Sequence, residues 1–258
     1  MSKVTDRLDN KQIIELAKKN YDNKQKSSKF PGHIVKFPSA GKVYPESSPL
    51  RNGSVEMRAM TAYDEDILTN SSYLSEGILF DKLLEALILT SGVDVNDIIN
   101  ADKESLIISA RILGYGAEYE TIITKDGKEQ EYTVDLSQLK YEPFELESDE
   151  NGEFLYENES TGDVLKYRYM NSAESAKISK ENLISDFLKY TVTEVNGSRT
   201  KKDIDNFLTY NFRAIDSKKF RAYVINNTPS INYDIEIEGE DGSTFTAGFL
   251  PGADLFWF

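Results

Sequence analysis

The chain has 258 residues, of which 39% are hydrophobic, enough to bury the core of one large domain or two modest ones. Its 30 basic and 44 acidic residues give a formal net charge of -14 at pH 7, which repels nucleic acid and anionic lipid. The absence of cysteine excludes disulfides, thiol nucleophiles and cysteine-ligated metals. The one histidine, His33, leaves no pair for the commonest acid–base designs, and we expect it at the surface or at a strand edge.

The sequence contains no signal for a membrane. No apolar run reaches the roughly 20 residues that cross a bilayer. The first residues, MSKVTDRLDNKQ, lack the apolar core of a signal peptide. We therefore expect a protein without a membrane partner that stays in the cytoplasm of the cell that makes it.

Residues 1–30 predict a flexible, polar N-terminal arm with one short helix. Ile13, Ile14 and Leu16 form a narrow apolar stripe, and a charged, serine-rich stretch without a core pattern follows it. We interpret the arm as a docking segment, with these three residues as its candidate contacts.

A domain of strands, helices and a hairpin is predicted for residues 31–147. It begins with short strands and tight turns, because a strong turn dipeptide, Asn52-Gly53, precedes the alternating residues 55–59.

Residues 61–116 predict a block of helices. Thr61 fits a helix N-cap, and the acidic run 64–66 suits the positive end of the helix dipole better than a metal site. Asp102 is expected to cap the last helix of the block, and Gly114 and Gly116 to end it.

Three β-hairpins follow, each centred on an Asp-Gly or Thr-Gly pair, at residues 119–136, 154–170 and 231–250. Helical patterns separate the second hairpin from the third; they cover residues 173–180, 181–192, 201–214 and 216–226. A linker-like run at 148–153 suggests a further domain at 148–258, which could also pack as one unit with 31–147. The whole predicts an α+β fold, a helical block with several hairpins and a hairpin-rich C-terminal half.

No motif in the sequence predicts catalysis. Gly114 and Gly116 follow a helix instead of preceding one, so they do not form a phosphate loop. Asp234, Glu236 and Glu238 alternate as on the solvent face of a strand, and a weak calcium site is the less favoured interpretation. We expect no enzymatic activity, no catalytic, cofactor or metal site, and no small-molecule substrate.

Four stretches, taken together, resemble one protein family. They are a Gly-x-x-Tyr-Pro loop with a Gly-x-Val-Glu-x-Arg strand and an acidic helix start at 37–70, the turn ARILGYGAEYE at 110–120, a helix and Thr-Pro strand at 216–238, and the aromatic end FLPGADLFWF at 249–258. In this order they resemble the baseplate hub subunits and hub-assembly proteins of contractile-tailed bacteriophages of the T-even type.

The resemblance implies a structural or assembly role in the central baseplate hub, through protein–protein contacts. Its partners would be other baseplate hub proteins, with the tape-measure protein as a further candidate, and its location the host cytoplasm during assembly and then the tail baseplate of the virion. Two alternatives stay open: a transient assembly chaperone absent from the virion, and a tail-associated glycan hydrolase using two carboxylates about 5 to 10 Å apart.

One departure from the family concerns two of the hairpins. Relatives carry Cys-x-x-Cys pairs in the segments equivalent to 120–134 and 234–246, a spacing typical of a zinc clip. This chain has Asp-Gly turns there and no cysteine, so we expect packing alone to hold these hairpins.

The chain ends with four apolar residues, Leu255, Phe256, Trp257 and Phe258, in an otherwise acidic sequence. Either they fold back onto the protein's own core, or they insert into a partner, where Trp257 would be a binding hot spot. They are therefore the second set of candidate interaction residues.

Overall fold

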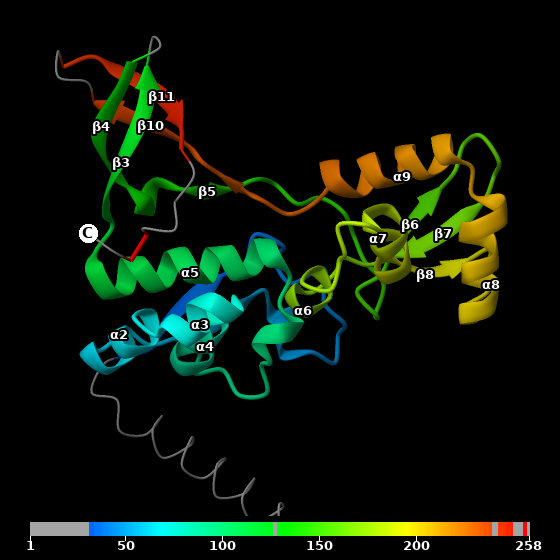
Figure 1. Ribbon diagram of the computed structural model, residues 1–258, viewed down its shortest axis with the longest axis horizontal. Helices are drawn as coiled ribbons and strands as arrows, with labels where there is room; N and C mark the ends of the chain where they lie inside the picture. Colours follow the sequence, from blue (N-terminus) through cyan, green and yellow to red (C-terminus); the bar gives the residue numbers. More distant parts are fainter. Residues whose placement is uncertain (1–30, 126–127, 239–241, 250–254, 257–258) are drawn as a thin grey trace, which may run out of the picture.

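The computed structural model describes residues 31–125, 128–238, 242–249 and 255–256 (Figure 1). The fold is α+β, as predicted. Its helices are α2 (Ala62–Leu68), α3 (Ser71–Glu76), α4 (Leu79–Leu87), α5 (Asn100–Tyr115), α6 (Ser172–Ser175), α7 (Leu183–Thr191), α8 (Lys201–Asn206) and α9 (Ala214–Asn226). Short 3-10 helices are η1 (Pro49–Asn52), η2 (Val95–Asp97) and η3 (Leu136–Gln138), and a π-helix, η4 (Phe207–Asn211), extends α8.

The strands form small antiparallel sheets, which the helices link and cover. They are β1 (His33–Lys36) with β2 (Ser54–Met57), β3 (Glu118–Lys125) with β4 (Lys128–Asp135), β5 (Lys140–Tyr141) with β9 (Ile231–Asn232), β10 (Asp234–Glu238) with β11 (Thr244–Gly248), and the three-stranded sheet β6 (Phe154–Glu157), β7 (Val164–Tyr167) and β8 (Val192–Val195).

The predicted start of the helical block is confirmed. Thr61 and Asp64 form a capping box at the start of α2, and the carboxylate of Asp64 is buried. Along α4, the apolar residues Leu83, Leu84 and Leu87 are fully buried, as an amphipathic helix requires.

The predicted helix cap at Asp102 is wrong. The helix α5 begins at Asn100, so Asp102 lies inside its first turn, and its side chain points into the core instead of to the helix end. A buried carboxylate here needs hydrogen-bond donors from elsewhere in the chain, and the loop after β1 supplies them. Of the two glycines predicted to end the helix, Gly116 is its C-cap, whereas Gly114 lies inside α5.

All three predicted hairpins are confirmed. In β10, Ile235 and Ile237 are buried, whereas Asp234 and Glu236 are exposed, as on a solvent face. The hairpins β3–β4 and β10–β11 lie together at the upper left of Figure 1, where the rings of Tyr132 and Phe245 lie 5.5 Å apart. An aromatic contact thus joins the two hairpins.

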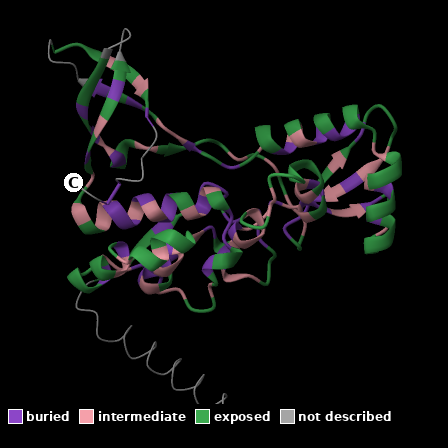
Figure 2. Ribbon diagram, in the orientation of Figure 1, coloured by how far each residue is buried: buried purple, intermediate pink, exposed green. Residues whose placement is uncertain are grey.

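The strand β8 is absent from the sequence prediction, which extends a helix through residue 192. The helix α7 ends at Thr191, and the β-branched run that follows pairs with β7. Tyr167 of β7 packs edge-on against Phe220 of α9, with ring centroids 5.6 Å apart. Figure 2 shows that the visible face of α9 is largely exposed, so the helix buries one side only.

The linker-like run 148–153 packs against the loop before η1. The N–H of Glu46 donates to the carbonyl of Glu150 at 2.9 Å. Gly152 has a φ of +73°, and a Cβ there would lie 2.8 Å from the carbonyl oxygen of Val43, so this backbone contact requires glycine.

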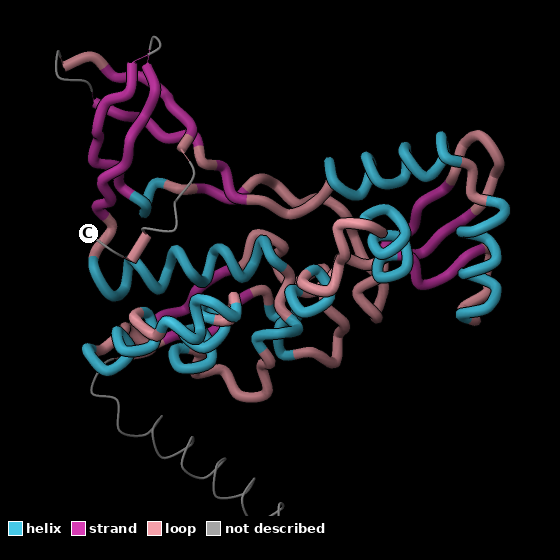
Figure 3. Tube along the Cα trace, in the orientation of Figure 1, coloured by secondary structure: helices cyan, strands magenta, loops and turns pink. Residues whose placement is uncertain are grey.

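Two extended segments connect the parts of the chain on either side of this run. β5 and β9 pair antiparallel and lie side by side between the hairpins and the three-stranded sheet (Figure 3). The division into 31–147 and 148–258 stays a prediction.

Candidate interaction surfaces

The loop after β1 is organised around the buried carboxylate of Asp102. Ser39 donates twice to it, from its N–H at 3.0 Å and from its hydroxyl at 2.6 Å, and the Tyr44 hydroxyl donates at 2.6 Å. That hydroxyl accepts in turn from the N–H of Ile99 at 3.2 Å. Burial raises the pKa of Asp102 to about 6, although the hydrogen bonds from Ser39 and Tyr44 oppose the shift.

A second set of contacts closes the same loop. One guanidinium nitrogen of Arg51 donates to the carbonyls of Lys42 and Tyr44, at 3.0 and 2.8 Å, and to the Ser148 hydroxyl at 2.8 Å. Gly41, with φ of +81°, approaches the backbone so closely that a Cβ would lie 2.4 Å from the carbonyl oxygen of Arg51. The loop is therefore a rigid scaffold and not an open binding loop.

The charged residues of the next motif are also engaged internally. Arg58 and Asp64 form a bidentate pair, with nitrogen–oxygen distances of 2.6 and 2.8 Å. Burial opposes ionisation of Asp64, but the hydrogen bonds from Arg58 and Thr61 hold its pKa below the ordinary value. This geometry fixes the start of α2 and occupies the carboxylate that the acidic run would need for a metal.

Arg111 holds the turn from α5 into the β3–β4 hairpin. Its side chain is buried and donates to the carbonyls of Gly116, at 2.8 Å, and Glu118, at 3.0 Å. The guanidinium also lies 5.3 Å from the ring centroid of Tyr115, a cation–π distance. Sequence reasoning marked this stretch only as a motif; the signal for its role is a buried arginine beside a helix-ending glycine.

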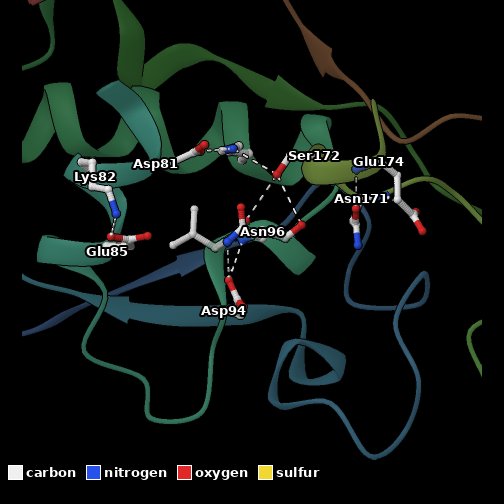
Figure 4. Close-up of polar contacts among 10 residues, drawn as sticks. Asp81, Lys82, Glu85, Asp94, Asn96, Asn171, Ser172 and Glu174 are labelled. Carbon is white, nitrogen blue, oxygen red and sulfur yellow. Dashed lines mark hydrogen bonds and ion pairs between the residues drawn. The ribbon is translucent and has the colours of Figure 1, made fainter. Parts of the chain in front are cut away.

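The junction between the helical block and α6 is polar (Figure 4). Lys103 of α5 pairs with Asp81 of α4 and donates to the Ser172 hydroxyl at 3.0 Å. The N–H of Ser172 donates to the carbonyl of Ile98 at 2.9 Å, and the side chain of Asn171 accepts from the N–H of Glu174 at 2.9 Å. These contacts hold α6 against α5 and η2.

A cleft of about 320 Å³ opens beside this junction. Its lining includes Tyr44, Asp97, Arg168, Tyr169 and Glu174. Arg168 and Glu174 form a bidentate pair at 2.8 and 2.6 Å. Burial and then the neighbouring carboxylates raise the pKa of Asp97, whereas the hydrogen bonds from Arg168 outweigh burial and lower that of Glu174. This cleft therefore brings together two carboxylates whose pKa values shift in opposite directions.

The polar side chains of these motifs thus serve the internal scaffold, and comparison with known families places the chain. Residues 31–247 match the family model described as T4 bacteriophage base plate protein. The chain belongs to this T4-type baseplate protein family. No curated protein and no solved structure matches it significantly. The family match leaves out the arm and residues 248–258.

Members of a baseplate family interact with other baseplate proteins, so the relevant sites are surfaces that can bind a partner protein. Among the described residues, no group of three or more histidine, cysteine, aspartate or glutamate side chains could hold a metal ion. In the same part of the chain, no helix is long and apolar enough to cross a membrane.

The structure describes two of the candidate interaction residues. Leu255 and Phe256 are 5% and 4% exposed, and the Phe256 ring lies 5.9 Å from that of Phe80 and 6.3 Å from that of Tyr115. Both residues are thus buried in their own chain, and the Phe256 ring lies against rings of α4 and α5. The remaining candidates lie outside the described residues; they are Ile13, Ile14, Leu16, Trp257 and Phe258.

Several large apolar side chains are exposed on other elements, and sequence patterns did not single them out as interaction residues. The most exposed are Ile34, Tyr63, Leu74, Ile122, Leu155, Leu183, Tyr210 and Ile225. Scattered exposed apolar residues are ordinary on a soluble surface. An exposed apolar side chain indicates a docking surface only where it adjoins a groove or an open sheet edge.

Proposed function

We propose that this chain is a structural component of the central hub of a contractile phage baseplate, and that it acts through protein–protein contacts. The family match over 31–247 carries the proposal. The motif residues Tyr44, Arg51 and Arg111 add support, because their side chains form internal hydrogen bonds that hold the scaffold together.

Purified virions provide the test. Mass spectrometry of tails is expected to detect the chain at a fixed ratio to other hub proteins, and electron cryomicroscopy is expected to place it at the tail axis. A mutant phage that lacks the gene is expected to accumulate tail parts without complete baseplates. If the mutant shows this defect but wild-type virions lack the chain, the protein is instead a transient assembly chaperone.

The partners we propose are other hub proteins and the tape-measure protein. The arm, through Ile13, Ile14 and Leu16, and the tail residues Trp257 and Phe258 are the candidate contacts. Co-expression of the full chain and of a variant lacking residues 1–30 with each candidate partner would test the arm. A chain ending at Gly252 tests the tail: insolubility indicates a role in the core, and a soluble protein that no longer assembles indicates a partner.

The glycan hydrolase is the competing function, because the cleft beside α6 brings Asp97 and Glu174 together with pKa values shifted in opposite directions. Against it, Glu174 is held by Arg168 and accepts from the N–H of Asn171, so it is committed to the helix cap. An assay on purified peptidoglycan should show no cleavage above that of Asp97→Asn and Glu174→Gln. Cleavage that both variants abolish would favour the enzyme.

A further inference from the structure

We propose that the open edge of strand β6 is a docking site for an extended segment of a partner protein that carries basic side chains. The three-stranded sheet has the order β6-β7-β8, so β6 is an edge strand. An edge strand presents unpaired N–H and C=O groups, which pair readily with an added strand.

The hydrogen-bond pattern shows which groups of β6 face outward. The N–H of Asn158 donates to the carbonyl of Asp163 at 2.8 Å. Because hydrogen-bonded pairs alternate in an antiparallel ladder, Tyr156 and Phe154 also face β7, whereas Leu155 and Glu157 face the open edge. On β7, Val164 lies opposite Glu157, and its carbonyl accepts from the N–H of Asn196, just after β8, at 2.8 Å; this fits the same alternation.

The edge is closed at one end and open along the rest. The carbonyl of Glu153 accepts from the N–H of Asp149 at 2.9 Å, so the turn before β6 covers the edge there. From Leu155 to Glu157, no hydrogen bond reaches the outward groups within the part of the chain that the structure describes. Two outward residues provide four main-chain groups for an added strand.

A groove accompanies this edge. Its volume is about 300 Å³, and it is lined by residues 155–159 of the strand end and by Lys219 and Tyr223 of α9. The Leu155 side chain beside it is 60% exposed. Five residues of an added strand would extend about 17 Å along it, with backbone pairing on one side and Leu155 as an apolar contact.

The charge of the edge selects the occupant. Glu157 and Glu159 are exposed and line the groove, against one basic residue, Lys219. A second copy of this chain, with net charge -14, would bring its own acidic edge against this one. Leu155 and Glu157 lie two residues apart on β6, so their side chains share one face of the sheet, and Tyr156 points to the other. A segment that alternates basic and apolar side chains places its lysines or arginines on the first face, where their charges meet Glu157 and their methylene stems contact Leu155. Its apolar side chains then lie on the face of Tyr156.

A capped seven-residue peptide that alternates lysine with valine provides the probe, and the same peptide with glutamate for lysine is its control. In nuclear magnetic resonance titrations of the full chain, the basic peptide is expected to shift the amide signals of Leu155 and Glu157 and to slow their hydrogen exchange. The acidic peptide is expected to bind at least about tenfold more weakly.

Two variants separate backbone pairing from the side-chain contact. Leu155→Pro removes the outward N–H without breaking a bond to β7, and is expected to weaken binding about tenfold. Leu155→Ala keeps that N–H and is expected to weaken binding less. If Leu155→Pro does not fold, Glu157→Lys replaces it and should shift the preference toward the acidic peptide.

Four results would overturn the proposal: exchange protection of both amides in the free protein, equal binding of the two peptides, no effect of Leu155→Pro or Glu157→Lys, or a dimer that these variants dissociate. The inference goes beyond the hub role, because a failure of peptide binding leaves the result on virions unchanged.

Discussion

The Tyr44 hydroxyl is expected to be one of the most stabilising single groups in the protein. It donates to the buried carboxylate of Asp102 at 2.6 Å and accepts from the N–H of Ile99 at 3.2 Å. Tyr44→Phe removes the hydroxyl and little volume, so Asp102 and Ile99 each lose a buried hydrogen bond.

The expected loss follows from these two bonds. A hydrogen bond to a charged group contributes about 1.5–3 kcal/mol, and a buried N–H left unpaired costs about 1–3 kcal/mol. Because partial relaxation offsets some of the loss, we expect Tyr44→Phe to lower the free energy of unfolding by about 3 kcal/mol. For a chain of this size, that corresponds to a melting temperature lower by about 6–12 °C.

Urea unfolding at pH 7.5, followed by circular dichroism, measures this loss while Asp102 is ionised. Tyr210→Phe is the matched control, because Tyr210 is 80% exposed and the same atom is removed. The control is expected to change the free energy of unfolding by less than about 0.5 kcal/mol. Equal effects of the two variants would refute the assignment of Tyr44 and Asp102 as a stabilising network.

Three further predictions concern other parts of the fold. Because the pKa of Asp102 is raised to about 6 in the folded state, the folded protein keeps this proton to a higher pH than the unfolded chain does. The free energy of unfolding should therefore fall by about 3 kcal/mol as the pH rises from about 4 to about 6. Asp102→Asn should remove this pH dependence in urea titrations. Arg111→Lys cannot reach both carbonyls of the turn and should cost about 2 kcal/mol, with faster hydrogen exchange in β3 and β4 measured by mass spectrometry. Phe256→Ala should cost about 2–4 kcal/mol in thermal unfolding, whereas Leu155→Ala on the surface should cost little.

Much of the secondary structure follows from local sequence. Hairpins with an Asp-Gly or Thr-Gly turn between alternating residues, the capping box at Thr61 and Asp64, and the helix stop at Gly116 all depend on neighbouring residues only. Sequence patterns predict these features well because a turn or a cap is decided within a few residues. The strand β8 was missed because Val192 continues an apolar pattern that is equally consistent with a helix.

The internal network of the scaffold could not be predicted in the same way. Asp102 lies in a position that suits a helix cap, and nothing local indicates that its partners are Ser39 and Tyr44, more than fifty residues earlier. Likewise, Gly152 lies in a polar run typical of a linker, yet its backbone contacts the loop at Val43. Tertiary contacts determine the positions of Asp102 and Gly152, and patterns in a single sequence do not show which distant residues will be in contact.

The distribution of buried and exposed residues separates the side chains that hold the scaffold together from those that we expect to select partners. Two of the stretches that resemble the family supply the hydrogen bonds of Tyr44 and Arg111, and Tyr44 binds the buried carboxylate of Asp102; all three side chains are buried. A substitution in these motifs should therefore reduce the amount of folded protein and weaken every interaction together. A substitution at Leu155 or Glu157 should leave stability unchanged and weaken only the interaction that uses the β6 edge, so measuring stability and binding in the same variants distinguishes scaffold from docking surface.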